Sequence, residues 1–117
     1  IIDKERQKPG EVAQMNLVGE VSGRTALIPD DMIDTGGTLC AASQILRLKG
    51  ARNIICYGTH GIFTKGTTEL KDHFDVVITS NTHPQNLDGV EVIDMSSIFA
   101  EAIYRAQFGL SISKLFE

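Results

Sequence analysis

The feature that most constrains the fold is an alternation of short apolar runs with segments of helical periodicity. Residues 25–28 form a continuous apolar run, which is typical of a strand covered on both faces in a parallel sheet. After a polar loop, apolar residues recur at helical spacing from Leu39 to Leu48, and Gly50 follows where a C-terminal cap belongs. This pattern predicts a strand followed by an amphipathic helix of about three turns.

The same alternation continues to the end of the chain. Further strands are predicted over residues 53–57, 75–79 and 90–93, with a short helix over residues 67–72 and a final helix from Ser96 or Ser97 to Gly109. Apolar strands that alternate with helices require right-handed crossovers. We therefore predict an α/β fold, a three-layer sandwich whose mostly parallel central sheet is flanked by helices.

The N-terminal segments follow a different pattern. Alternation of apolar and polar residues over 13–17 predicts a half-buried edge strand that stops at Gly19. Residues 1–11 are polar and charged around Pro9-Gly10, which predicts a mobile arm. The expected organisation is an arm over residues 1–11 and a single domain over residues 12–117. Because the chain begins with Ile, we expect a processed or partial sequence.

Composition excludes several classes of protein. The 117 residues carry 11 Lys and Arg against 15 Asp and Glu, a net charge of −4, which argues against a nucleic-acid partner. Apolar runs are too short for a membrane span, and no secretory signal is visible, so no membrane partner is expected. Cys40 and Cys56 lack zinc-ligand spacing and a disulfide framework, and we expect both to be small core residues.

The stretch from Ile28 to Thr38 carries the chemistry, because it joins a buried strand to a helix N-terminus, where open α/β sheets bind ligands. Gly36 and Gly37 allow a tight turn whose N–H groups converge, and the hydroxyls of Thr35 and Thr38 add donors to this phosphate cradle.

Three carboxylates lie in the same stretch, namely Asp30, Asp31 and Asp34. They would repel a bare anion and are better suited to ligand hydroxyls or to a ligand-borne magnesium ion. A phosphorylated sugar presents both features. The alternative is that Asp34 caps the helix and the glycines only turn the chain.

This stretch resembles the phosphoribosyl-diphosphate binding loop of type I phosphoribosyltransferases. Three further parts of the chain resemble the ribose-phosphate diphosphokinases within that group: residues 3–6 with 15–19, residues 59–63, and residues 100–103 with 111–116. The resemblance covers nearly the whole chain and corresponds to the C-terminal half of the family's subunit.

The resemblance implies an activity and its partners. Members transfer the diphosphoryl group of ATP to the anomeric hydroxyl of ribose 5-phosphate with magnesium, giving phosphoribosyl diphosphate and AMP. A cytoplasmic homo-oligomer is implied, with the magnesium ligands and adenine contacts mainly in the N-terminal half of the subunit and in the substrates. No metal ligand is therefore assigned in this chain, which we expect to be inactive alone.

The resemblance also implies roles for individual residues. Lys4 would be the catalytic lysine, and Arg6 its companion in catalysis and substrate binding. Asp30 would bind the ribose hydroxyls, with Asp31 in the same substrate site. The 5-phosphate would be bound by the loop residues Asp34, Thr35, Gly36, Gly37 and Thr38.

The C-terminal segment would contribute Ser111 and Ser113 to an effector site for phosphate and ADP. Two departures from the family pattern are Pro29, where an aliphatic residue is common, and Glu5, where many relatives carry Arg. Pro29 puts the last hydrogen bond of its strand in doubt.

Two rival functions share the cradle. A phosphoribosyltransferase of nucleotide salvage would need a base-binding hood and no Lys4-x-Arg6 arm. A non-catalytic, synthetase-associated regulatory subunit would keep the fold without turnover. His60, at a strand end, is expected to be a hydrogen-bonded structural residue rather than a ligand.

Overall fold

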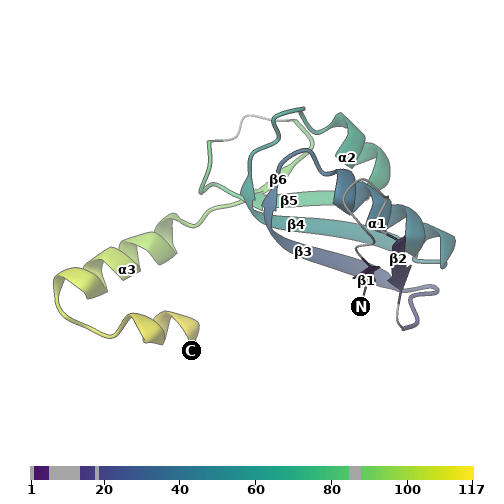
Figure 1. Cartoon of the computed structure of the whole chain (residues 1–117). Coiled ribbons are helices and arrows are strands. Elements are labelled where there is room, and N and C mark those ends of the chain that lie inside the picture. Colours follow the sequence, from purple (N-terminus) through teal and green to yellow (C-terminus); the bar gives the residue numbers. More distant parts are fainter. Residues whose placement is uncertain (1, 6–13, 18, 85–87) are drawn as a thin grey trace.

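A parallel four-stranded sheet forms the centre of the molecule (Figure 1). The computed structural model describes residues 2–5, 14–17, 19–84 and 88–117. The sheet strands lie side by side in chain order and all run parallel: β3 (Thr25–Ile33), β4 (Asn53–Gly61), β5 (Val76–Ser80) and β6 (Glu91–Ile93). The predicted α/β class with a parallel sheet is confirmed.

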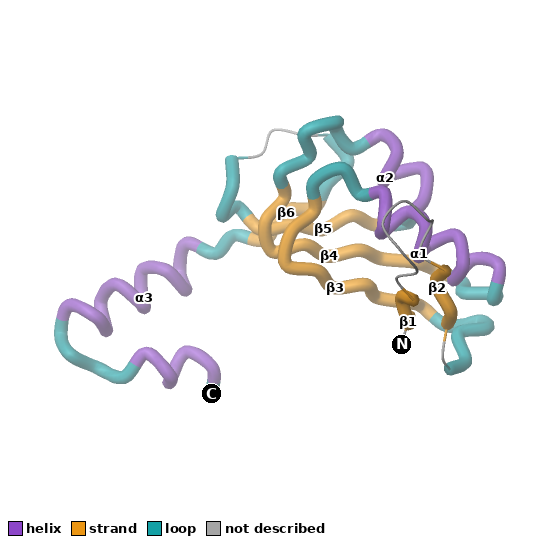
Figure 2. The backbone as a smooth tube through the Cα atoms, viewed as in Figure 1, coloured by secondary structure: helices purple, strands orange, loops and turns teal. Residues whose placement is uncertain are grey.

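Two helices, α1 (Gly37–Leu48) and α2 (Thr68–His73), cover one face of this sheet (Figure 2). Both lie on one side, as right-handed crossovers between strands in sequential order require. Alternate residues of β4 point toward them and are fully buried, as Ile54 and Cys56 show. The core between the two layers consists mainly of Ile33, Leu39, Leu46, Ile54, Leu70, Phe74 and Val77.

Strand β3 is longer than the sequence predicted. The apolar run ends at Ile28 and a polar loop was expected to follow it, but the strand continues through Asp30 and Asp31, in register with β4, to Met32↔His60 and Ile33↔Gly61. Both aspartates are exposed, so their charges stay hydrated and the strand incurs no desolvation penalty. Pro29 is tolerated because β3 pairs only with β4 among the described strands, leaving its other edge without a ladder.

The N-terminal strands form a separate two-stranded antiparallel sheet. β1 (Ile2–Glu5) pairs with β2 (Gln14–Leu17), and β2 lies against α1. The predicted strand over residues 13–17 therefore exists but does not join the main sheet. Residues 2–5 of the predicted arm therefore form a strand, in which the ladder satisfies the backbone groups on the facing edges of β1 and β2. The rest of the predicted arm, residues 6–11 with residue 1, lies outside the described residues.

The predicted third layer is not formed by the described residues. α3 (Ser96–Gln107) and the short 3-10 helix η1 (Ile112–Phe116) project away from the sheet, and none of their residues is buried (Figure 1). The expected apolar face is present, with Ile98, Phe99 and Ile103 exposed. Periodicity predicted the helix correctly, but it could not show that no part of the described chain covers that face.

The two ends of α3 differ in how well they were predicted. Gly109 follows the helix with a left-handed φ of +65°, as expected of a C-terminal glycine. At the other end Met95, rather than Ser96 or Ser97, occupies the N-cap position. The carboxylate of Asp94 accepts hydrogen bonds from the N–H and hydroxyl of Ser96, so the serine is a donor here and not the cap.

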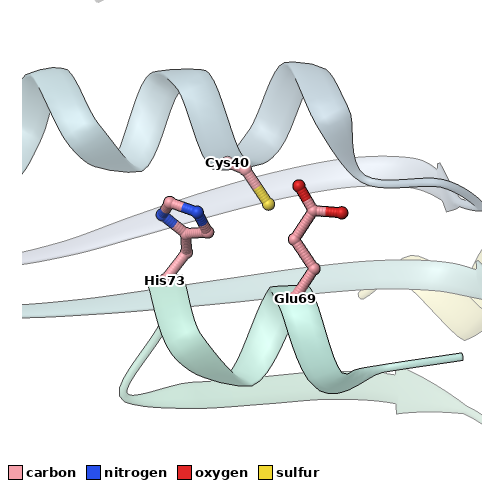
Figure 3. Close-up of side chains that lie close together, drawn as sticks. All are labelled: Cys40, Glu69 and His73. Carbon is pink, nitrogen blue, oxygen red and sulfur yellow. The ribbon is translucent and has the colours of Figure 1, made fainter.

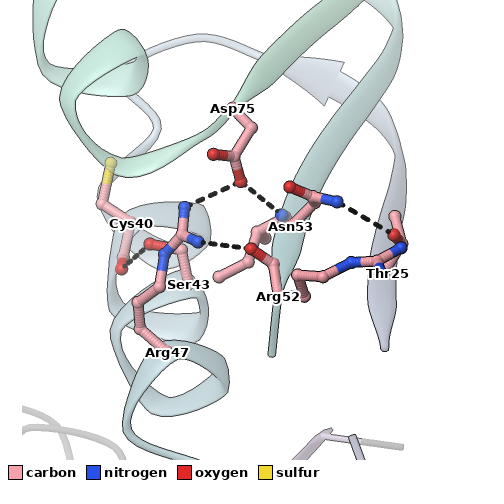
Figure 4. Close-up of polar contacts among 8 residues, drawn as sticks. Thr25, Cys40, Ser43, Arg47, Arg52, Asn53 and Asp75 are labelled. Carbon is pink, nitrogen blue, oxygen red and sulfur yellow. Dashed lines mark hydrogen bonds and ion pairs between the residues drawn. The ribbon is translucent and has the colours of Figure 1, made fainter. Parts of the chain in front are cut away.

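A polar junction around Asp75 joins α1, β4 and the start of β5 (Figure 4). Its Oδ2 accepts hydrogen bonds from the backbone N–H of Ile54 at 2.6 Å and from Nη2 of Arg47 at 2.8 Å. Arg47 also donates through Nη1 to the carbonyl of Arg52 at 3.2 Å. These contacts, the Ile54 N–H bond first, hold the pKa of the Asp75 carboxyl below its ordinary value of 3.8.

Replacing Asp75 by Asn should lower the free energy of unfolding by about 1–2 kcal/mol at neutral pH, since a charged acceptor shared by two donors is lost at a partly exposed site. The wild-type advantage is complete above the unfolded pKa near 3.8 and disappears as the pH falls through the lower folded pKa. Urea unfolding at pH 7 and about pH 2 measures both effects. An Asp72→Asn control, at an exposed position of α2, should change little.

Candidate anion-binding site

The connection from β3 to α1 lies at the carboxyl edge of the sheet, where the sequence predicted the ligand. It borders an open pocket of about 190 Å³. The lining residues are Asp30, Met32, Ile33, Asp34, Thr35, Gly36, Gly37, Thr38 and Leu39. The structure thus brings together most of the substrate residues that the resemblance implied. It adds three apolar residues that were not predicted as part of the site, Met32, Ile33 and Leu39.

The two glycines of the loop have different structural roles. Gly36 adopts a left-handed conformation with φ +76°, and a Cβ added there would lie 2.6 Å from Cδ2 of Leu70 on α2. The fold therefore needs glycine at this position for both its backbone angle and its close approach. Gly37 has no positive φ, and a Cβ there would meet nothing within 4 Å. The space beside Gly37 is thus free for a ligand.

The N-terminus of α1 is open toward the pocket. Gly36 occupies the N-cap position, no side chain from the described residues caps the helix, and its first turn holds no acidic residue. The first helical bond runs from the Cys40 N–H to the Gly36 carbonyl at 2.8 Å, and the N–H groups before it have no partner within a helix. Such an end attracts anions. The alternative that Asp34 caps the helix is therefore wrong.

Asp34 instead ties the loop to the segment that follows β4. Its Oδ1 accepts hydrogen bonds from the backbone N–H of Thr64 at 3.1 Å and from the Thr64 hydroxyl at 2.5 Å. Immediately before it, the carbonyl of Ile33 accepts the N–H groups of Ile62 at 2.8 Å and Phe63 at 3.3 Å. The end of β3 and the start of the loop are therefore held by residues 62–64.

The electrostatics of Asp34 agree with this role. The Thr64 hydroxyl, the Thr64 N–H and the nearby charge of Lys65 hold the pKa of the Asp34 carboxyl below its ordinary value, with the hydroxyl contributing most. The carboxylate is consequently ionised and engaged at neutral pH. In the structure this carboxylate connects the loop to Thr64.

Of the other described residues that the resemblance assigned to the substrate site or to catalysis, only Asp30 lines the pocket. Its carboxylate accepts the Asp31 N–H at 2.9 Å, whereas Asp31 does not line the pocket. The backbone of Lys4 lies in β1, paired with Met15, and Arg6 falls outside the described residues.

The two candidate effector serines do not line the pocket; Ser111 is the N-cap of η1 and Ser113 lies within it, in the C-terminal segment that projects from the sheet (Figure 1). The Ser111 and Ser113 hydroxyls share a hydrogen bond of 2.7 Å. The carbonyl of Ser111 also accepts Nη1 of Arg105 at 3.1 Å.

Sequence reasoning missed Thr64, which lies thirty positions from its partner Asp34. The parallel register of β3 with β4 is the signal that could have found it, because Ile33 pairs with Gly61 and the residues that follow must then meet. His60 matches its expected structural role: its Nδ1 lies 2.7 Å from the hydroxyl of Thr82.

Both cysteines are buried and unpaired, as expected for core residues. Burial raises the pKa of the Cys56 thiol to about 11. Burial, with a smaller effect of the Glu69 charge, also raises the pKa of the Cys40 thiol. Neither group is therefore a ready nucleophile at neutral pH.

In the described part of the chain, no helix has the length and apolar character to cross a membrane.

The fold and the loop define an α/β protein with an open helix N-terminus beside a pocket at the carboxyl end of a parallel sheet, the position where such folds bind ligands. Comparison with known families makes this specific. Residues 3–117 match the family described as the phosphoribosyl synthetase-associated domain, and the chain belongs to this family.

Individual relatives agree with the family assignment. The chain is 38% identical to a ribose-phosphate pyrophosphokinase of Brucella melitensis, over 100% of this chain and 40% of the relative. It is 43% identical to ribose-phosphate pyrophosphokinase 2 of Saccharomyces cerevisiae, over 99% of this chain and 38% of the relative.

A solved structure is also similar. The crystal structure of phosphoribosylpyrophosphate synthetase from Mycobacterium smegmatis matches with a TM-score of 0.76 and 31% identity, over 82% of this chain and 34% of that one. The chain thus spans about two fifths of the length of the curated relatives described above.

Three glycine-to-alanine variants should separate the roles of the loop glycines. Gly66 also has φ +76° but meets nothing within 4 Å, so Gly66→Ala should cost only the backbone strain of about 1–2 kcal/mol. Gly36→Ala should cost about 1–3 kcal/mol more through its clash with Leu70. Gly37→Ala should leave stability equal or slightly higher. Chemical denaturation of all three is the measurement, and equal costs at 36 and 66 would contradict the close-approach argument.

Proposed function

We propose that this chain provides the ribose 5-phosphate site of a ribose-phosphate diphosphokinase. The reaction would transfer the diphosphoryl group of ATP to the anomeric hydroxyl of ribose 5-phosphate, giving phosphoribosyl diphosphate and AMP. One observation carries the proposal: the uncapped N-terminus of α1 and the 34–38 loop open onto a pocket that also contains the carboxylate of Asp30. That combination suits a ligand with a phosphate at one end and hydroxyls at the other.

The loop would bind the 5-phosphate through groups that donate hydrogen bonds. The N–H groups of Gly37 and Thr38 belong to the open first turn of α1, and the hydroxyls of Thr35 and Thr38 line the same pocket. The positive end of the helix dipole adds to their attraction for phosphate. Asp30 would accept hydrogen bonds from the ribose hydroxyls, and Asp34 would hold the loop through Thr64.

Magnesium fits the donor set at one side of this site. The carboxylates of Asp30 and Asp31 are exposed oxygen ligands of the type that magnesium prefers alongside substrate phosphates. Within the described residues, the three loop aspartates do not gather into a cluster that could hold the ion alone. Other ligands would come from the substrates and the remainder of the enzyme. Bound magnesium would supply charge neutralisation on the polyphosphate.

The transfer itself would require charge from the N-terminal segment. The anomeric oxygen attacks the β-phosphorus of ATP and loses its proton, the bond from that phosphorus to the α–β bridging oxygen breaks, and AMP leaves. Phosphoryl transfer depends on positioning and on stabilising the developing negative charge. Lys4 and Arg6 are the cations proposed for this task. The Lys4 backbone pairs with Met15 of β2, the strand that contacts α1.

The rival functions are weighed by the comparisons. The curated relatives are named pyrophosphokinases, which favours the synthetase over a phosphoribosyltransferase of nucleotide salvage. The family description, a synthetase-associated domain, suits both the enzyme and a non-catalytic partner of it. Release of AMP from ATP and ribose 5-phosphate by the full-length protein supports the enzyme, while binding without turnover supports the regulatory subunit.

Binding of ribose 5-phosphate should depend on the pocket. Gly37→Val fills the free space beside the loop and should abolish binding, and Asp30→Asn should weaken it by about tenfold or more through loss of a charged acceptor. Isothermal titration calorimetry with ribose 5-phosphate measures both. The matched control Asp72→Asn, on the exposed side of α2, should bind as the wild type does. Unchanged affinity in Gly37→Val would contradict the site.

Turnover should depend on Lys4. In the full-length protein, Lys4→Ala should reduce AMP release by several orders of magnitude, yet leave the affinity for ribose 5-phosphate nearly intact, because its charge is needed as negative charge develops in the transition state. Arg6→Ala should act similarly with some loss of binding. Lys114→Ala, in the C-terminal 3-10 helix, is the control for loss of a positive charge. Near-normal turnover in both arm variants would contradict their proposed role.

A further inference from the structure

Three side chains of metal-ligating type, from two helices, converge between α1 and α2 (Figure 3). Cys40 comes from the first turns of α1, and Glu69 and His73 come from α2. Their ligand atoms, a sulfur, a carboxylate oxygen and an imidazole nitrogen, all lie within 4.8 Å of one another. Among the described residues, no other group of three or more such side chains lies this close together, and none of these three lines the anion pocket.

The packing of the two helices produces this convergence. Glu69 and His73 are four positions apart, so they lie on the same face of α2. Leu70 between them is buried and fills the space left by Gly36, which fixes α2 against the start of α1. Cys40 is only 4% exposed, and its sulfur points between the other two side chains.

We propose that Cys40, Glu69 and His73 bind one divalent cation of the zinc class. A thiolate with an imidazole favours zinc or cobalt over magnesium and calcium, which prefer oxygen ligands throughout. Ligands at zinc distances of about 2.0–2.3 Å in a tetrahedron lie about 3.3–3.8 Å from one another. Small rotations of the Glu69 and His73 side chains, which are less buried than Cys40, would close the remaining distance.

Charge and access are suitable for such an ion. The cation displaces the thiol proton of Cys40 to solvent, and the thiolate and the Glu69 carboxylate then balance its two positive charges. His73 borders an open groove that Ser43, Gln44 and Asp72 also line. A water molecule from that groove can occupy the fourth coordination position. The bound ion would join the first turns of α1 directly to α2.

Cobalt provides the test, since a thiolate ligand gives Co²⁺ a near-ultraviolet charge-transfer band and a tetrahedral site gives strong visible bands. Titration of the 117-residue chain with CoCl₂ should show both, saturating at one ion per chain, and ZnCl₂ should displace the cobalt. Cys40→Ser should abolish the charge-transfer band. Glu69→Gln and His73→Gln should each weaken binding about 100-fold or more.

Matched controls keep the outcome specific. Cys56→Ala removes the other buried thiol, and His60→Gln removes a histidine outside the cluster, and both should leave the cobalt spectrum unchanged. Glu69→Gln and His73→Gln change side chains outside the core, so they test the site even if Cys40→Ser does not fold. Absence of the charge-transfer band in the wild-type chain, or equal affinity in the wild type and the α2 variants, would overturn the proposal.

Discussion

The hydrogen bonds that residues 62–64 donate to Ile33 and Asp34 hold the end of β3 beside the end of β4, and the geometry of the loop depends on them. Two glycines of β4 make this contact possible. A Cβ at Gly58 would lie 2.4 Å from Cγ1 of Ile33, and one at Gly61 would lie 2.3 Å from Cε2 of Phe63. The small residues of one strand therefore admit the large side chains that anchor both connecting segments.

The start of α1 carries two different chemistries on two sides. Toward the sheet edge it presents open N–H groups, threonine hydroxyls and the free space at Gly37, which suit a phosphate. Toward α2 it presents the Cys40 thiol between a carboxylate and an imidazole. Gly36 separates the two, because its contact with Leu70 sets how closely α2 approaches the loop. A change in the spacing of the two helices would therefore be transmitted to the loop.

Local sequence patterns predicted the elements that depend on local physics. The strand at residue 25, the helix ending before Gly50 and the glycine at 109 follow from periodicity and from backbone conformations that favour glycine. The pocket residues were also placed together, because the loop is a single stretch between a strand and a helix. The end of β3 was misplaced because exposed aspartates do not break a strand whose partner continues.

Contacts between distant segments were not predictable in the same way. Thr64 meets Asp34, and Cys40 meets Glu69 and His73, only after the crossovers have brought the segments together. Because the three proposed metal ligands come from two helices that lie far apart in the sequence, they do not form a recognisable metal-binding motif with fixed spacing. The prediction of a third layer went beyond the structure for a related reason. The periodicity of α3 shows that the helix has an apolar face, but none of the described residues covers that face.

We propose above all that the loop at the start of α1 binds the phosphate of ribose 5-phosphate. Titration of the ¹⁵N-labelled chain with ribose 5-phosphate, followed by amide chemical shifts, tests it most directly. We expect saturable shifts centred on the amides of Thr35, Gly36, Gly37 and Thr38, with smaller shifts at Asp30 and Thr64, and weaker binding of ribose itself. Saturable shifts located elsewhere, with these amides unmoved, would contradict it.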